Sequence, residues 1–144
     1  VSVKADYAVR SMAYLASQPG RRVLIAEIAQ EVAVPRPFLS KIMKKLVAGG
    51  LLRSQTGPGG GYQLTREPSR ISFKDILELV EGPWNLVPCQ DSEEDCCVLH
   101  GSCSQVRVWD QIRAEMLGVL ASYSLEGVKY EASGDSAGPL ALYS

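Results

Sequence analysis

The chain has 144 residues, of which 46% are hydrophobic and 22% are charged. This composition is enough to bury one hydrophobic core, and it excludes a chain dominated by disorder. The longest apolar stretches are interrupted by charges before the roughly 18 residues that a membrane span needs, and no basic-then-apolar leader opens the chain. We therefore expect a cytoplasmic protein without membrane contact.

The formal net charge of −1 hides a segregation of charge along the sequence. Up to Arg66, ten Lys and Arg residues stand against three acidic residues, a balance of +7, whereas the remainder holds five bases and thirteen acids, a balance of −8. The basic half favours a polyanionic partner, and the acidic half indicates a different role.

Apolar residues at helical spacing predict helices over residues 4–17 and about 24–32. After a tight connection we expect a third helix. Pro37 suits its first turn, and Gly49-Gly50 suit its end. Its apolar stripe contains Leu39, Ile42 and Leu46. The opposite face presents Pro37, Ser40, Lys41, Lys44 and Lys45. Two short helices with this division of faces are typical of a helix-turn-helix.

Two short strands, residues 51–55 and 61–65, flank the glycine-rich run TGPGGG and predict a hairpin of the kind called a wing. The glycines at 57, 59, 60 and 61 leave the backbone free to adopt positive φ and to approach a ligand closely. Taken alone, such a run is more typical of an ordinary flexible loop. Ser72 and Asp75 then predict a capping box at the start of a helix that ends near Glu81.

All four cysteines fall within fifteen positions: Cys89, Cys96, Cys97 and Cys103. In a cytoplasmic chain, such clustering is more typical of metal ligands or redox thiols than of disulfides. Thiolate is a soft donor that suits iron-sulfur clusters, zinc and copper(I). The segment 83–104 has little periodicity, so we expect a loop that a ligand orders. Crowding between Cys97 and Cys103 indicates that His100 lies near the metal or at the surface rather than acting as a ligand.

A heptad-like seam, spaced by three and four, follows the cysteines and predicts a long helix. Its members are Trp109, Ile112, Met116, Val119 and Tyr123. The apolar stripe of this helix is longer than a small winged domain can cover, so we interpret residues 105–128 as a dimerisation helix. The alternative is that the helix packs against its own domain. We expect residues 129–144, rich in Ser, Gly and Ala, to be disordered.

The predicted fold is therefore mainly α with a small β-hairpin wing. We expect residues 1–82 to form a winged helix-turn-helix DNA-binding domain, residues 83–104 the cysteine-rich loop, and residues 105–128 the dimerisation helix.

The sequence resembles the family of winged-helix repressors that includes the iron-sulfur regulator IscR, the nitric-oxide sensor NsrR and the iron regulator RirA. The resemblance covers about residues 3–126 and rests on DYAVRSMAYLA, IAEIAQEVAVPRPFLSKIMKKLVAGGLL, RSQTGPGGGYQLTR and CCVLHGSCSQVRVW.

The resemblance implies a homodimer on a double-stranded DNA operator, with the third helix in a major groove and the wing at the minor groove. Some relatives carry glutamate at the position of Ser40 and arginine at that of Thr56, so their operator is not expected here. Lysines of the third helix would contact phosphates, although a basic face is also commonly only solvated. The expected DNA-binding residues are Arg36, Pro37, Ser40, Lys41, Lys44, Lys45, Thr56, Gly57, Gly59, Gly60, Gly61 and Tyr62.

The resemblance also implies an iron-sulfur cluster, of the 4Fe-4S rather than the 2Fe-2S type, on Cys89, Cys97 and Cys103. Cys96 offers an alternative register. In certain relatives the position of Asp6 carries an acidic ligand, which we expect here from the partner subunit. The alternative for Asp6 is the stabilisation of the positive end of the first helix. A structural zinc site and a cluster-free thiol switch remain alternatives for the cysteines.

We expect a transcriptional regulator, a repressor that senses redox state, nitric oxide or iron, and not an enzyme. The single histidine lies in the cysteine loop, and GPGGG follows a strand without opening a helix, so neither a catalytic constellation nor a cofactor motif is evident. No small-molecule substrate is expected. An electron carrier is the remaining alternative, although the C-x2-C-x2-C run of bacterial ferredoxins is missing.

Overall fold

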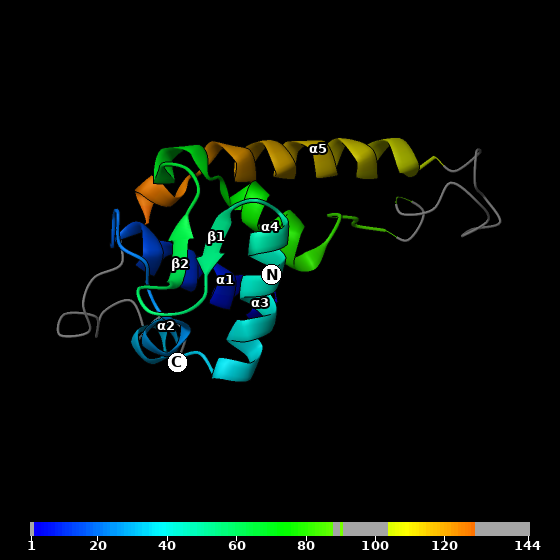
Figure 1. Cartoon of the computed structure of the whole chain (residues 1–144). Coiled ribbons are helices and arrows are strands. Elements are labelled where there is room, and N and C mark those ends of the chain that lie inside the picture. Colours follow the sequence, from blue (N-terminus) through cyan, green and yellow to red (C-terminus); the bar gives the residue numbers. More distant parts are fainter. Residues whose placement is uncertain (1, 88–89, 91–103, 129–144) are drawn as a thin grey trace.

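A computed structural model describes residues 2–87, 90 and 104–128, within which a helical body carries one β-hairpin (Figure 1). The expectations for the cysteine positions and for residues 129–144 lie outside the described residues. The elements are α1 (Val3–Ala16), α2 (Ile25–Val32), α3 (Arg36–Ala48), β1 (Leu52–Gln55), β2 (Gly61–Leu64), η1 (Pro68–Arg70), α4 (Phe73–Glu81), α5 (Val106–Ser122) and η3 (Leu125–Gly127). None of the helices in these ranges is long and apolar enough to cross a membrane.

Local sequence signals account for the helix ends. The capping box is confirmed, since Asp75 N donates to Ser72 Oγ at 3.1 Å and Ser72 N donates to Asp75 Oδ2 at 3.0 Å. Between α2 and α3, Ala33 adopts a left-handed conformation with φ 55°, and Pro37 lies in the first turn of α3. This tight turn produces the predicted helix-turn-helix.

The hairpin is the predicted wing, with β1 antiparallel to β2 and Leu52 opposite Leu64. The loop before α2 adds a further rung, an isolated bridge to β2 that the sequence did not predict. Val23 N donates to Tyr62 O at 2.9 Å, and Tyr62 N donates to Val23 O at 2.8 Å. An isolated two-stranded hairpin is marginally stable, so this pairing anchors the wing to the helical body.

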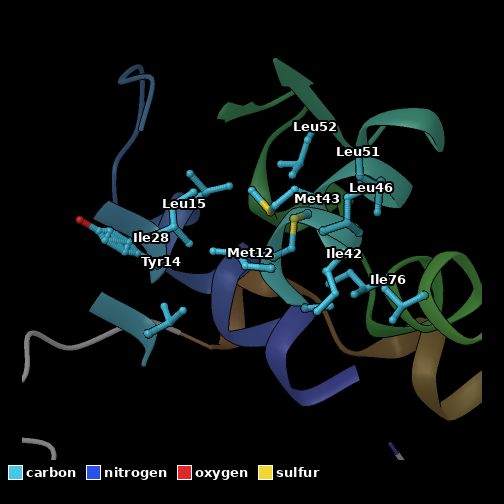
Figure 2. Close-up of a cluster of buried hydrophobic side chains, with 14 of the residues drawn as sticks. Met12, Tyr14, Leu15, Ile28, Ile42, Met43, Leu46, Leu51, Leu52 and Ile76 are labelled. Carbon is cyan, nitrogen blue, oxygen red and sulfur yellow. The ribbon is translucent and has the colours of Figure 1, made fainter. Parts of the chain in front are cut away.

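One hydrophobic core lies where α1, α2, α3, α4 and the base of β1 meet (Figure 2). Met12 from α1, Ile28 from α2, Met43 from α3 and Ile76 from α4 are all completely buried. The four helices therefore each turn one apolar stripe inward, and for α1, α2 and α3 the helical spacing predicted this.

The long helix α5 runs along one edge of the molecule, and its N-terminal half projects beyond the body (Figure 1). It packs on α4, but none of its residues is buried. The helix ends at Ser122, before the predicted limit of 128, because the following backbone becomes extended. Phe73 N donates to Tyr123 O at 2.9 Å, and Leu125 N donates to Ile71 O at 3.0 Å, which returns the chain to the core.

Leu125 anchors this return, because its side chain is only 1% exposed within the core cluster. We predict that Leu125→Ala lowers the free energy of unfolding by about 2–5 kcal/mol, since it leaves a cavity in a packed site. Leu24→Ala is the matched control, because Leu24 is 60% exposed, and its cost should stay within about 0.5 kcal/mol. Urea titrations of both variants measure the difference, and equal midpoints would contradict the anchoring role.

Candidate nucleic-acid interface

The helix α3 divides into a buried and an exposed face. Leu39, Ile42, Met43 and Leu46 are at most 3% exposed. Arg36, Pro37, Lys41, Lys44 and Lys45 are exposed, and Ser40 is partly buried. The core thus fixes which side of the helix can meet a partner, and the predicted basic residues lie on that side.

The lysines of α3 differ in their surroundings. Lys45 Nζ donates to Val80 O at 3.2 Å and so joins the C-terminal part of α3 to α4. Within the described part of the chain, no hydrogen bond or ion pair holds Lys41 or Lys44. Their ammonium groups are therefore available for an anionic ligand without breaking an existing contact.

The wing glycines also fall into two pairs. Gly57 and Gly59 have φ of 83° and 75°, are exposed, and a Cβ on either would meet nothing within 4 Å. Gly60 and Gly61 are buried, and their Cβ atoms would lie 2.3 Å from Gln55 O and 2.6 Å from Val23 O. The first pair forms the open tip of the wing, and the second allows the hairpin and the Val23 rung to pack closely.

The remaining wing residues of the predicted set also differ in exposure. Thr56 is exposed beside the wing tip, whereas Tyr62 is half-buried against the core. The Tyr62 backbone forms the rung with Val23, so part of its role is to hold the wing in place.

A polar cluster that the sequence did not predict lies beside this rung. Tyr14 Oη donates to Glu27 Oε2 at 2.6 Å, and Arg21 forms an ion pair with the same carboxylate. Hydrogen bonds from Arg21 and then Tyr14 lower the pKa of Glu27, and burial, reinforced by the bond to Glu27, raises the pKa of Tyr14 to about 12. The cluster ties the loop before Val23 to α1 and α2. Its members are too far apart in sequence for a spacing rule to find them.

Asp6, predicted as a metal ligand, lies in the first turn of α1 with a side chain that is 47% exposed. Arg10 Nη2 donates to Asp6 Oδ2 at 2.5 Å, and Arg10 Nη1 donates to Val32 O at 3.2 Å. The carboxylate is thus at the surface and paired with a guanidinium that also contacts the last residue of α2. The i,i+4 spacing of this pair is a signal that the sequence contained.

The other predicted metal ligands, Cys89, Cys96, Cys97 and Cys103, lie outside the described residues. The N-terminal part of segment 83–104 is held to α5 through Asn85 and Gln90. Arg113 Nη1 donates to Asn85 Oδ1 at 2.8 Å, and Gln90 Nε2 donates to Asp110 Oδ1 at 3.0 Å. Among the described residues, no group of three or more His, Cys, Asp or Glu side chains could hold a metal ion.

The predicted seam on α5 is unevenly covered by its own chain. Trp109, Ile112 and Met116 are half-buried, whereas Val119 and Tyr123 are 58% and 62% exposed. Packing within the chain therefore accounts for part of the seam only, and an apolar strip remains at the surface of α5.

Comparisons with known proteins agree with this arrangement. The model of the Rrf2 family, described as an iron-dependent transcriptional regulator, matches residues 1–130. A putative HTH-type transcriptional regulator of Aquifex aeolicus is 33% identical, over 76% of this chain and 77% of that protein. The HTH-type transcriptional regulator NsrR of Bacillus subtilis is 29% identical, over 83% of each chain.

Solved structures give the same result. CymR, the global cysteine regulator of B. subtilis, superposes with a TM-score of 0.68 at 29% identity, over 88% of this chain and 92% of that one. IscR of T. potens superposes with a TM-score of 0.65 at 28% identity, over 92% and 93%. With its helix-turn-helix and wing, the chain belongs to the Rrf2 family and is a winged-helix transcriptional regulator.

Proposed function

We propose that this regulator binds operator DNA as a homodimer and represses transcription according to redox state, nitric oxide or iron, which it senses through an iron-sulfur cluster on its cysteines. The observation that supports DNA binding most directly is the exposed basic face of α3, where Lys41 and Lys44 have no partner within the described part of the chain. Cations with open donors suit phosphate oxygens. The open wing tip supplies a second contact, at the minor groove.

The salt dependence of DNA binding tests the roles of these lysines. Lys41→Ala and Lys44→Ala should each flatten the plot of log affinity against log salt by about 0.9 unit, because each phosphate contact releases a counterion. Lys45→Ala should change the slope less, because Val80 O already holds the Lys45 ammonium group. Fluorescence anisotropy on a nonspecific duplex measures the slopes, and unchanged slopes for Lys41→Ala and Lys44→Ala would remove α3 from the interface.

The cysteines and Asp6 form a donor set that fits an iron-sulfur cluster. Thiolates of Cys89, Cys97 and Cys103 are soft ligands for iron, with Cys96 as the alternative to Cys97. Three thiolates leave one position for a harder and weaker donor, and the exposed carboxylate of Asp6 of the partner subunit can serve. When bound, such a cluster supplies reactivity toward oxygen and nitric oxide. Asn85 and Gln90 bond this segment to α5. A cluster that orders the segment would therefore also restrain the proposed dimer helix.

A thiol switch without a cluster is the second candidate. The solved structures with this fold include an oxidized form of CymR from Staphylococcus aureus, at 26% identity and a TM-score of 0.65. Here the adjacent Cys96 and Cys97, with Cys89 and Cys103, supply thiols for such chemistry. Zinc on the same cysteines would be structural, since zinc has no redox chemistry of its own.

Anaerobic purification with iron, sulfide and zinc counts separates these candidates. We predict that alanine at Cys89, Cys97 or Cys103 abolishes the visible chromophore, that Cys96→Ala leaves it intact, and that Asp6→Ala keeps a cluster with an altered spectrum and faster loss. Arg10→Ala is the control, since it breaks the Asp6 ion pair but leaves the carboxylate. Equal effects of Arg10→Ala and Asp6→Ala would assign the change to the ion pair, and protein without iron would favour zinc or the thiol switch.

The proposed dimer rests on the exposed strip of α5. Val119→Asp places a charge on a side chain that is 58% exposed in the single chain, so the fold should tolerate it. In a dimer the same charge would be buried without a partner, which costs several kcal/mol and should yield monomers. Gln111→Asp, at an exposed polar position of α5, should remain dimeric. Analytical ultracentrifugation distinguishes the two, and a dimeric Val119→Asp protein would place the interface elsewhere.

A further inference from the structure

One exposed aromatic side chain has no role in the core or in the contacts described above. Phe38 lies in the first turn of α3, and its side chain is 55% exposed. The other large hydrophobic residues exposed in the described part of the chain lie outside α3: Val3, Leu24, Val108, Val119 and Tyr123. About half of this phenyl ring faces solvent on a polar helix face, and a partner that covered it would gain the free energy of burying apolar surface.

The surroundings of Phe38 determine which partner suits it. Arg36, Lys41 and Lys44 are exposed on the same helix, and Lys41 stands three residues after Phe38, which makes the two neighbours on the helix surface. An apolar protein surface would have to bury or displace these cations. A polyanion that also presents apolar groups fits both features, and the major groove of DNA presents the C5-methyl groups of thymine among its phosphates.

The position of Phe38 along α3 agrees with this partner. In a helix-turn-helix, the N-terminal residues of the recognition helix are those that reach base edges. Phe38 is in this first turn, whereas Lys45 is farther along the helix and is held to α4.

We propose that Phe38 is a specificity-determining residue that selects thymine by packing its ring against the C5-methyl group. This inference rests on the proposed DNA-binding function and adds a base preference to it. The contact involves no hydrogen bond, so it distinguishes thymine from cytosine and from uracil by the methyl group alone.

A double-mutant cycle tests the proposal. A duplex selected from a random pool by the full-length wild-type protein is prepared with thymine and with uracil, which pairs identically and keeps the O4 acceptor but lacks the methyl group. For the wild type, uracil should weaken binding about four-fold for each contacted methyl group. Phe38→Ala should bind the thymine duplex more weakly by at least that factor and should not distinguish the two duplexes. Single thymine-to-uracil replacements then locate the contacted base pair.

Two variants control for indirect effects. Val108→Ala removes apolar surface of similar exposure, 59%, from α5 and should keep the full sensitivity to uracil. Phe38→Leu retains an apolar side chain and should keep part of the sensitivity to uracil. Thermal unfolding of Phe38→Ala should match the wild type, because the ring is not part of the core.

The outcomes separate this inference from the function on which it rests. Equal sensitivity to uracil in the wild type and Phe38→Ala would assign the methyl groups to another residue and overturn the proposal. A wild type that binds both duplexes equally would also overturn it, while leaving DNA binding intact. A wild type that retains no duplex from the pool would overturn the DNA-binding function and the Phe38 assignment together.

Discussion

Burial of one stripe of α3 is the constraint on which the rest of the molecule depends. A helix of 13 residues can turn only one face toward a core, and Leu39, Met43 and Leu46 on that face are completely buried. The apolar stripes of α1, α2 and α4 close around them (Figure 2). The polar face must then lie at the surface, so packing alone places Lys41 and Lys44 there, whereas Lys45 is also held by Val80 O.

The wing depends on this helical body because a short hairpin has little stability of its own. The rung between Val23 and Tyr62 joins it to the segment that leads into α2, and Glu27 holds that segment through Arg21 and Tyr14. Buried Gly61 permits the close approach to Val23 that this rung requires, and buried Gly60 permits the close approach to Gln55 O within the hairpin. The tip of the wing and the exposed face of α3, the two surfaces proposed to contact DNA, are consequently presented by one connected framework.

The helix α5 is attached at both ends by different means. At its C-terminal end, Leu125 is buried in the core and the preceding backbone pairs with the start of α4. Toward its N-terminal end, Arg113 and Asp110 hold the first part of the cysteine-rich segment 83–104, at Asn85 and Gln90. Under the proposed function, chemistry at the cysteines acts on the projecting half of α5, while the core fixes the other half.

The sequence by itself determined the helix-turn-helix, the hairpin, the capping box at Ser72 and the division of faces on α3, because helical periodicity, glycine and capping are local properties. Only the tertiary structure decided that Lys45 bonds to Val80 O, that Glu27 joins Arg21 to Tyr14, and that the chain after Ser122 pairs with the segment before α4. These contacts join residues far apart in the chain or without helical spacing. Their formation depends on how the elements pack, which no local pattern specifies.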